Sequence, residues 1–239
     1  MILRFIAILC FGFLLVSCKN KEVKLPVIQA KGLQELHNHS QVWLFFDVKN
    51  NDTLVKLNKK NTISSTHWVY NIDKRLPLKA IIPTVGKLKE KHAKSLHSKE
   101  GMHDYFSYAD ANTKKLSLLK FDEVSYTILD SDLNQYSKNE TDDEKKQIIK
   151  LIFKNNTICI NNKIIFPTSL ESNLLALLQA KESSDISVIE IQLLFSNDLL
   201  YQDYLNYKIT INKLLNNSIV LNSNEIIFNP GQTLNCRYY

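Results

Sequence analysis

Histidine is the residue type whose distribution in this chain most suggests chemistry, because all six histidines lie between residues 37 and 103. His37 and His39 stand one residue apart, directly before the apolar run 42–46. On an extended segment two such side chains point to the same side and could face one ion. Imidazole suits zinc, copper or nickel. The candidate metal ligands are therefore His37, His39 and His103. The other residues considered for the third position are His67, His92, His97 and Asp104.

The spacing of these histidines also has a simpler interpretation. Metal-binding pairs on a helix stand four residues apart, whereas His92 and His97 are five apart and fall on different faces. They lie within the lysine-rich stretch 87–99, whose charge repels a cation and is typical of a solvated helix face. We therefore interpret residues 35–40 (ELHNHS) as a polar lead-in to a strand. The metal site stays as the alternative.

No other catalytic pattern appears in the sequence. It contains no G-x-S-x-G nucleophile elbow, no glycine-rich phosphate loop and no H-E-x-x-H pair. Asp73 and Asp198 each follow an expected strand, where they are typical of helix caps or turns. Four aromatic residues alternate along strands, which predicts core positions or, on an exposed face, a partner or sugar platform: Trp43, Phe45, Trp68 and Tyr70. We expect that the protein is not an enzyme.

The N-terminal residues suggest a leader. Arg4 precedes an apolar run, Phe5 to Val16, which is shorter than the roughly 20 residues of a membrane-spanning helix and suits a signal peptide. The run ends in Leu15-Val16-Ser17-Cys18, which resembles the lipobox of bacterial lipoproteins. The resemblance implies that Cys18 is acylated and becomes the mature N-terminus, with the lipid as the membrane anchor and no other cofactor. The alternatives are an uncleaved anchor or ordinary secretion.

Composition narrows the compartment and the partners. The formal charge of +6 is spread along the chain without a basic run, so we expect no nucleic-acid partner. Lys19, Asn20 and Lys21 follow the lipobox cysteine in place of the acidic residues that direct some relatives to the cell surface, which favours a periplasm-facing location in the cell envelope. In that oxidising compartment Cys159 and Cys236 either form a disulfide or remain buried thiols.

The second half of the chain predicts an ordered series of elements. We expect a hairpin over 157–166, a helix from 168, a strand over 186–195, a second helix after 196 and one or two strands within 218–229. This order resembles the periplasmic domain of ExbD/TolR-type proteins, with Asp198 and Tyr201 at the start of the second helix. That family carries a transmembrane helix with an essential Asp, which this chain replaces by the leader. The resemblance therefore implies binding of an envelope protein or cell-wall polymer, without proton-driven chemistry.

The first half predicts a loosely similar unit, with a hairpin over 41–58, a strand and helix within 66–96 and a second hairpin over 103–121. We expect an α+β protein of two small mixed sheet-and-helix units, the second being hairpin-α-β-α-β, with a short helix over 144–153. The expected function is membrane-anchored binding or scaffolding, and the alternative is a metal-binding or hydrolytic lipoprotein. The expected divisions are signal peptide 1–17, lipidated linker 18–34, first unit 35–129, polar connector 130–143 and second unit 144–239.

Overall fold

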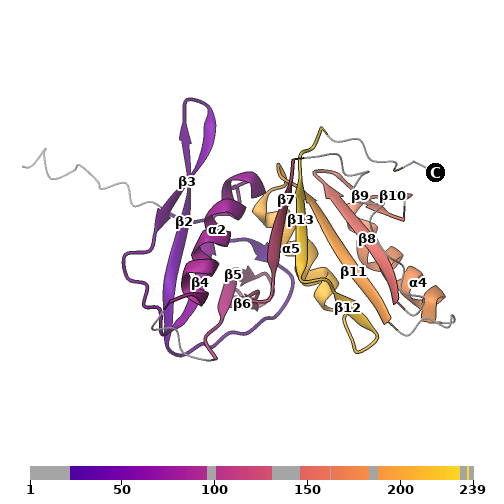
Figure 1. Ribbon diagram of the computed structural model, residues 1–239, viewed down its shortest axis with the longest axis horizontal. Helices are drawn as coiled ribbons and strands as arrows, with labels where there is room; N and C mark the ends of the chain where they lie inside the picture. The colour runs from indigo at the N-terminus through magenta and orange to yellow at the C-terminus, as the bar shows by residue number, and fades with distance from the viewer. Residues whose placement is uncertain are drawn as a thin grey trace, which may run out of the picture.

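The computed structural model describes residues 22–95, 101–130, 146–161, 163–182, 188–231 and Cys236. These residues form a mixed α/β fold of two mixed sheets with three α-helices. The two sheets lie side by side in Figure 1. None of the helices in the described ranges is long and apolar enough to span a membrane. The leader and the lipobox lie outside the described residues.

The first sheet has six strands in the order β1-β5-β4-β2-β3, with β6 beside β5. Only the β2–β3 and β5–β6 pairs are antiparallel. Helix α2 (Leu78–Ala93) connects β4 to β5, as expected, and it contains Pro83 in its interior. The strands are β1 (Val27–Ile28), β2 (His39–Lys49), β3 (Asp52–Asn58), β4 (His67–Ile72), β5 (Asp104–Asp110) and β6 (Leu116–Lys120).

The second sheet has seven strands in the order β10-β9-β8-β11-β13-β7, with β12 beside β11. A 3-10 turn η1 (Pro167–Ser169) and helix α4 (Leu170–Glu182) precede β11, and helix α5 (Tyr201–Asn212) follows it. The strands are β7 (Ser125–Leu129), β8 (Lys146–Lys154), β9 (Thr157–Ile160), β10 (Lys163–Ile165), β11 (Val188–Ser196), β12 (Ile219–Leu221) and β13 (Asn224–Phe228).

The two sheets repeat one topology. The order β3-β2-β4-β5-β1 matches β9-β8-β11-β13-β7, and in both series the first pair is antiparallel and the others are parallel. Helices α2 and α5 occupy matching places. β6 is an addition to the first half, and β10, α4 and β12 are additions to the second.

The two matching helices begin by capping each other. Their N-cap residues, Pro77 and Leu200, are extended and make no side-chain cap, and they form an antiparallel bridge. The N–H of Leu78 donates to the carbonyl of Leu199 (2.9 Å), and the N–H of Tyr201 donates to the carbonyl of Leu76 (2.9 Å). The first N–H groups of a helix lack intrahelical acceptors, so each half satisfies the start of the other half's helix.

An aromatic core joins the two halves. Phe106 stacks on Phe121 at 3.6 Å, and the ring of Tyr201 meets Phe106 edge-on at 5.7 Å. Tyr204 then meets Phe195 of the second sheet at 4.9 Å. All five rings are nearly or fully buried. The halves therefore share one hydrophobic core.

Two details differ from the sequence expectations. The prediction of a short helix over 144–153 is wrong, because residues 146–153 belong to strand β8, which lies between β9 and β11. Lys146, Lys150 and Lys154 recur every four residues with apolar residues between them, a spacing that resembles an amphipathic helix. Residues 125–129, assigned to the first unit, form β7 and pair with β13 of the second sheet. The expected connector 130–143 lies almost wholly outside the described residues.

Candidate functional site

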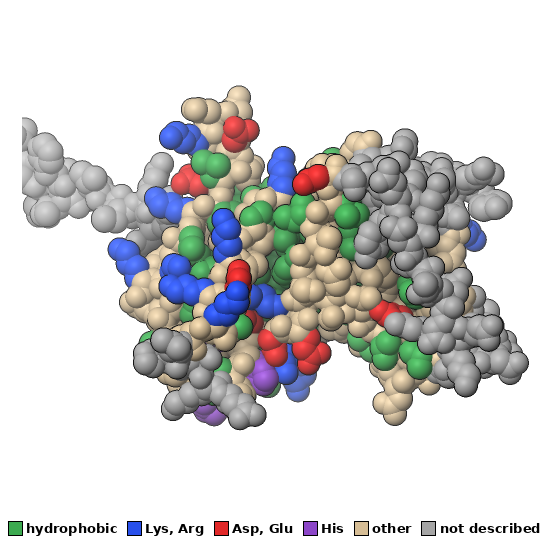
Figure 2. All heavy atoms as spheres, in the orientation of Figure 1, with side chains coloured by type: hydrophobic (Ala, Val, Ile, Leu, Met, Phe, Trp, Pro, Cys, Tyr) green, Lys and Arg blue, Asp and Glu red, His purple; other side chains and the backbone are tan. Residues whose placement is uncertain are grey.

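Three histidines form a row across the outer face of the first sheet, the face away from α2. His39 and His67 are neighbours in the register of β2 and β4, and the rings of His67 and His103 stack at 5.7 Å. The row stands where the parallel strands begin, because His103 directly precedes β5. Figure 2 shows histidine side chains at the lower edge of this part of the molecule.

Each ring in this row already uses its Nδ1 atom. The Nδ1 of His39 bonds the carbonyl of Leu36 (2.8 Å), and the Nδ1 of His103 bonds Asp122 (3.0 Å). The backbone N–H of His103 donates to the Nδ1 of His67 (3.0 Å), which keeps that nitrogen unprotonated. Burial lowers the pKa of His67, and the neighbouring His103 and His39 lower it further.

The proposed metal ligands are brought to one end of the sheet but not to one point. His37 is exposed in a bend before β2, where Asn38 adopts a positive φ of 52°. His37 and His39 line the same cavity of about 280 Å³, whereas His103 bonds Asp122. Among the residues that the structure describes, no three His, Cys, Asp or Glu side chains are grouped to hold a metal ion. His97 lies outside the described residues.

His92 lies on the other face of the sheet and has a structural role. It is 5% exposed, and its ring stacks on Trp68 at 4.2 Å. Its Nδ1 bonds Asp104 (2.9 Å) and its Nε2 bonds the carbonyl of Thr66 (3.1 Å). The ring thus ties the end of α2 to the starts of β4 and β5, and its burial leaves no room for a substrate.

The β2–β3 hairpin projects beyond the body of the first half (Figure 1). Strand β3 is the edge of the sheet, and among the described strands it pairs only with β2. Three large apolar side chains on this arm are exposed: Val48, Leu54 and Leu57. On the outer face Trp43 and Phe45 are half-buried and stack at 6.3 Å, whereas Trp68 and Tyr70 are core residues, as expected.

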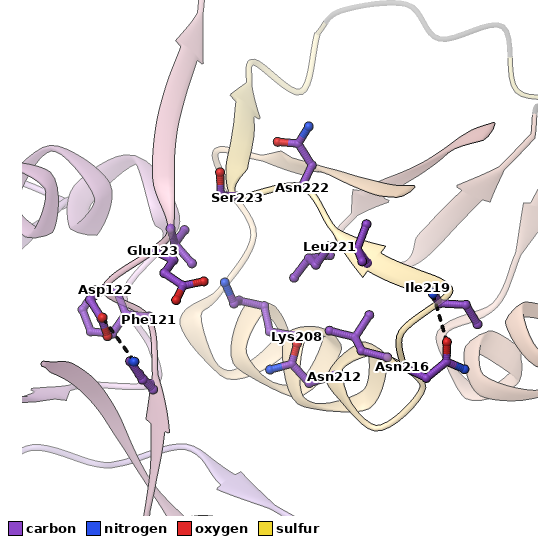
Figure 3. A pocket seen from close by; sticks show the side chains of 14 residues that line it. Phe121, Asp122, Glu123, Lys208, Asn212, Asn216, Ile219, Leu221, Asn222 and Ser223 are labelled. Carbon is purple, nitrogen blue, oxygen red and sulfur yellow. Dashed lines mark hydrogen bonds and ion pairs between the residues drawn. The ribbon is translucent and has the colours of Figure 1, made fainter. Parts of the chain in front are cut away.

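A cavity of about 410 Å³ opens between the two halves. We call it the interface cavity, and it is bounded by the turn 120–124, the end of α5 and residues 215–223 (Figure 3). Lys89 of α2 fixes the turn by donating hydrogen bonds to three of its carbonyls, those of Phe121 (3.0 Å), Asp122 (3.1 Å) and Val124. One wall of the cavity is therefore rigidly positioned by the first half.

One member of a buried ion pair, Lys208, lines another wall of this cavity. Lys208 on α5 is 2% exposed and its ammonium pairs with Glu225, which is fully buried. The hydroxyl of Tyr204 donates to the same carboxylate (2.8 Å) and lies 3.3 Å from the hydroxyl of Tyr126. The sequence expectations did not include these residues. The available signal was a lysine at position 208 between Tyr204 and Ile211 on the apolar stripe of a helix.

The two aspartates that follow strands are turn residues and not helix caps. Asp73 is fully buried and accepts hydrogen bonds from Arg75 Nε (2.8 Å) and Nη2 (2.7 Å). Asp198 accepts hydrogen bonds from Asn155 (3.0 Å) and from Ser196. Asp73 lies four residues before Pro77, and Ser196 lies four residues before Leu200, the partner of Pro77 in the bridge. Asp73 therefore corresponds to Ser196 and not to Asp198.

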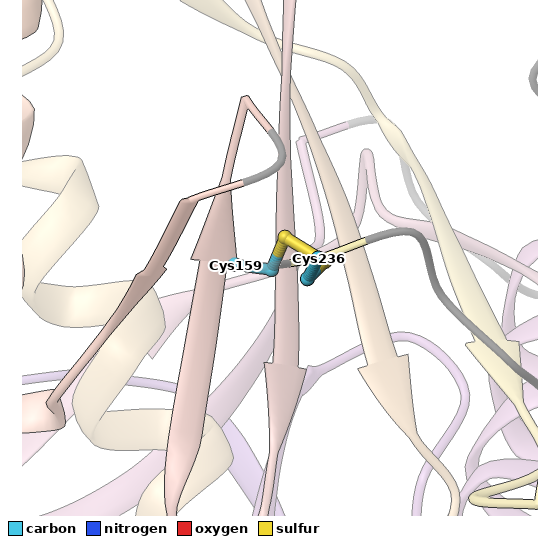
Figure 4. Close-up of a disulfide and its surroundings, with 2 residues drawn as sticks. All are labelled: Cys159 and Cys236. Carbon is cyan, nitrogen blue, oxygen red and sulfur yellow. A yellow bond between two sulfur atoms is a disulfide. The ribbon is translucent and has the colours of Figure 1, made fainter. Parts of the chain in front are cut away.

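Cys159 and Cys236 form a disulfide, one of the two alternatives that the sequence left open (Figure 4). Their Cα atoms are 6.1 Å apart. Cys159 pairs in register with Ile152, and Ile152 pairs with Leu194, so the bond lies on the sheet face opposite α5. It holds Cys236, near the C-terminus, against that face.

No family model, no curated protein and no solved structure matches the chain. The lipobox and the ExbD/TolR resemblance therefore stay predictions.

Proposed function

We propose that the protein is a lipid-anchored component of the bacterial cell envelope whose folded body binds another envelope protein and does not catalyse a reaction. The leader and the lipobox ending at Cys18 support the anchor. A disulfide between Cys159 and Cys236 suits an oxidising compartment such as the periplasm. The second half is, in this proposal, an ExbD/TolR-like unit, supported by its order of hairpin, α4, β11, α5 and β13.

The projecting β2–β3 arm is the observation that carries the binding role. An edge strand presents unpaired backbone N–H and carbonyl groups that add a strand from another chain. Leu54 and Leu57 on β3 are 43% and 36% exposed, and Val48 on β2 is 53% exposed. These side chains supply apolar contact beside an edge that no other described strand covers, so the partner is an extended protein segment that continues the sheet.

Cross-linking in living cells tests this role. A photo-reactive residue at Leu54 should give a discrete protein adduct, while the same residue at Leu175, which is similarly exposed on α4, should give none. Replacing Leu57 by Asp should abolish the adduct from position 54. Adducts to glycan alone would identify a cell-wall polymer as the occupant, and equal adducts from both positions would contradict a role for the arm.

The metal content of the purified chain distinguishes the binding proposal from the metal-binding or hydrolytic alternative. The row of His39, His67 and His103 is the observation that favours this alternative. The binding proposal predicts less than stoichiometric zinc or copper by mass spectrometry after mild dialysis. One equivalent of metal that disappears when His37 and His39 are both replaced by Ala would make the first half the active part.

A further inference from the structure

The interface cavity carries polar groups of opposite charge on facing walls. Figure 3 shows the ammonium of Lys208 and the carboxylate of Glu123 pointing toward one another across the opening. An ammonium group has three donor protons, and within the described residues Lys208 has Glu225 as its hydrogen-bond acceptor. Two donor protons of this buried group are therefore left for a ligand at the cavity wall.

The opposite wall carries two acidic residues, and one carboxylate oxygen of Asp122 has no donor among the described residues. The Oδ1 atom of Asp122 is buried and has no hydrogen-bond partner in the described part of the chain, while its Oδ2 bonds His103 and lies 3.5 Å from Lys120. Glu123 is exposed at the mouth of the cavity. A buried acceptor without a partner is costly, so this wall suits a ligand group that donates hydrogen bonds.

The floor between these walls is apolar. Leu215, Ile219 and Leu221 line the cavity beside the polar groups. Its volume of about 410 Å³ falls within the range of about 300–1,000 Å³ that is usual for small-molecule sites. The cavity thus presents a donor wall, an acceptor wall and an apolar surface within a space that fits a molecule of amino-acid or dipeptide size.

We propose that the interface cavity binds a small zwitterion with an apolar side chain, of the α-amino acid or dipeptide class. The ligand carboxylate accepts hydrogen bonds from the ammonium of Lys208. The ligand ammonium donates to Asp122 and Glu123, and the side chain packs against the apolar floor. Both charges are needed, because an anion alone meets Glu123 and a cation alone meets Lys208.

Calorimetric titration of the full chain, purified in detergent, tests the site. L-leucine and the dipeptide Leu-Leu are the zwitterionic probes, and the two distinguish a free amino acid from a peptide as the source. N-acetyl-L-leucine lacks the ammonium and L-leucinamide lacks the carboxylate. We expect at least one zwitterion to bind and both blocked compounds to bind about tenfold or more weakly, the loss expected for one charge-assisted hydrogen bond. No heat from either zwitterion, or equal affinity for a blocked compound, overturns the proposal.

Variants place the binding in this cavity. Glu123→Gln should weaken zwitterion binding about tenfold without changing Tm, because Glu123 is exposed and makes no described side-chain contact. Glu171→Gln on α4, also exposed, is the matched control and should leave affinity unchanged. Asn212→Leu, at the cavity wall, is a second variant that should weaken binding while the chain stays folded. Unchanged affinity in both Glu123→Gln and Asn212→Leu overturns the proposal.

Discussion

The two halves of the molecule share a strand order and differ in the length of its hairpin and in the elements added to it. The first half carries a long projecting hairpin and the histidine row on its outer face. The second half carries helix α4 and a disulfide that holds Cys236, near the C-terminus, against the outer face of its sheet. The shared strands and helices α2 and α5 supply most of the common core, and α4 adds Leu170, Leu174 and Leu178 to it. The projecting hairpin and the histidine row distinguish the surface of the first half, and the hairpin is where we place the binding role.

The largest expected difference between the halves comes from the disulfide. Replacing Cys159 and Cys236 by Ser should lower the free energy of unfolding by about 4 kcal/mol, from the loss of loop-closure entropy across 77 residues. Denaturant titration monitored by circular dichroism measures the change. Reductant should reproduce it in the native chain and have no effect on the double variant. If the native chain is equally stable with and without reductant, the disulfide does not contribute.

The next test concerns the matching core positions Leu76 and Leu199. Each precedes the bridged residue of its half and is fully buried. Replacement of either by Ala should cost about 3 kcal/mol, the usual loss for a buried leucine. Equivalent packing predicts that the two variants have the same denaturation midpoint. If the two variants lose clearly different amounts of unfolding free energy, the packing around the Pro77–Leu200 bridge is not equivalent in the two halves.

A smaller and unequal effect is expected at Asp73 and its counterpart Ser196. Burial raises the pKa of Asp73, but hydrogen bonds from Arg75 and from the backbone of Arg75 and Lys24 outweigh it and hold the pKa below its usual value. Asp73→Asn should therefore cost about 2 kcal/mol at neutral pH. Ser196→Ala removes a single hydrogen bond, which the Ser196 hydroxyl donates to the carboxylate of Asp198, and should cost about 1.5 kcal/mol. Equal losses would contradict the role of the Arg75 pair.

The smallest effect is a pH dependence that only the first half should show. The pKa of His67 is lowered in the folded chain, so as pH falls through about 6.5 the unfolded chain takes up a proton first and stability decreases. His67→Asn should flatten the stability curve between about pH 7.5 and 5. His37→Asn, on an exposed residue nearby, is the control. An unchanged slope in His67→Asn would show that other groups dominate.

Hydrophobic periodicity and turn residues predicted most local elements, because those signals are carried by adjacent residues. The hairpin around Asn161, helix α2 and strand β11 appear where the pattern placed them. The pattern failed at β8, because its lysines recur every four residues among apolar residues and so resemble the spacing of an amphipathic helix. It also assigned β7 to the wrong sheet, since the partner strand β13 is about 100 residues away and register between distant strands leaves no local signal.

The candidate sites were predicted less completely than the elements. The sequence indicated that histidines gather in the first half, but not that their Nδ1 atoms are already engaged, which depends on strand register. The interface cavity was missed because its walls come from three separate segments. Lys208 was a usable signal, since a lysine on the buried stripe of a helix needs a partner such as Glu225.

The reciprocal helix caps have a consequence for synthesis of the chain. The first turn of α2 needs the carbonyls of Leu199 and Asn197, which are made more than a hundred residues after it. A ribosome-bound chain that ends before α5 therefore cannot complete its first half, and Phe106 of β5 has no aromatic partner from Tyr201. The first half must wait for the second, which keeps the emerging polypeptide open until nearly all of it has been made.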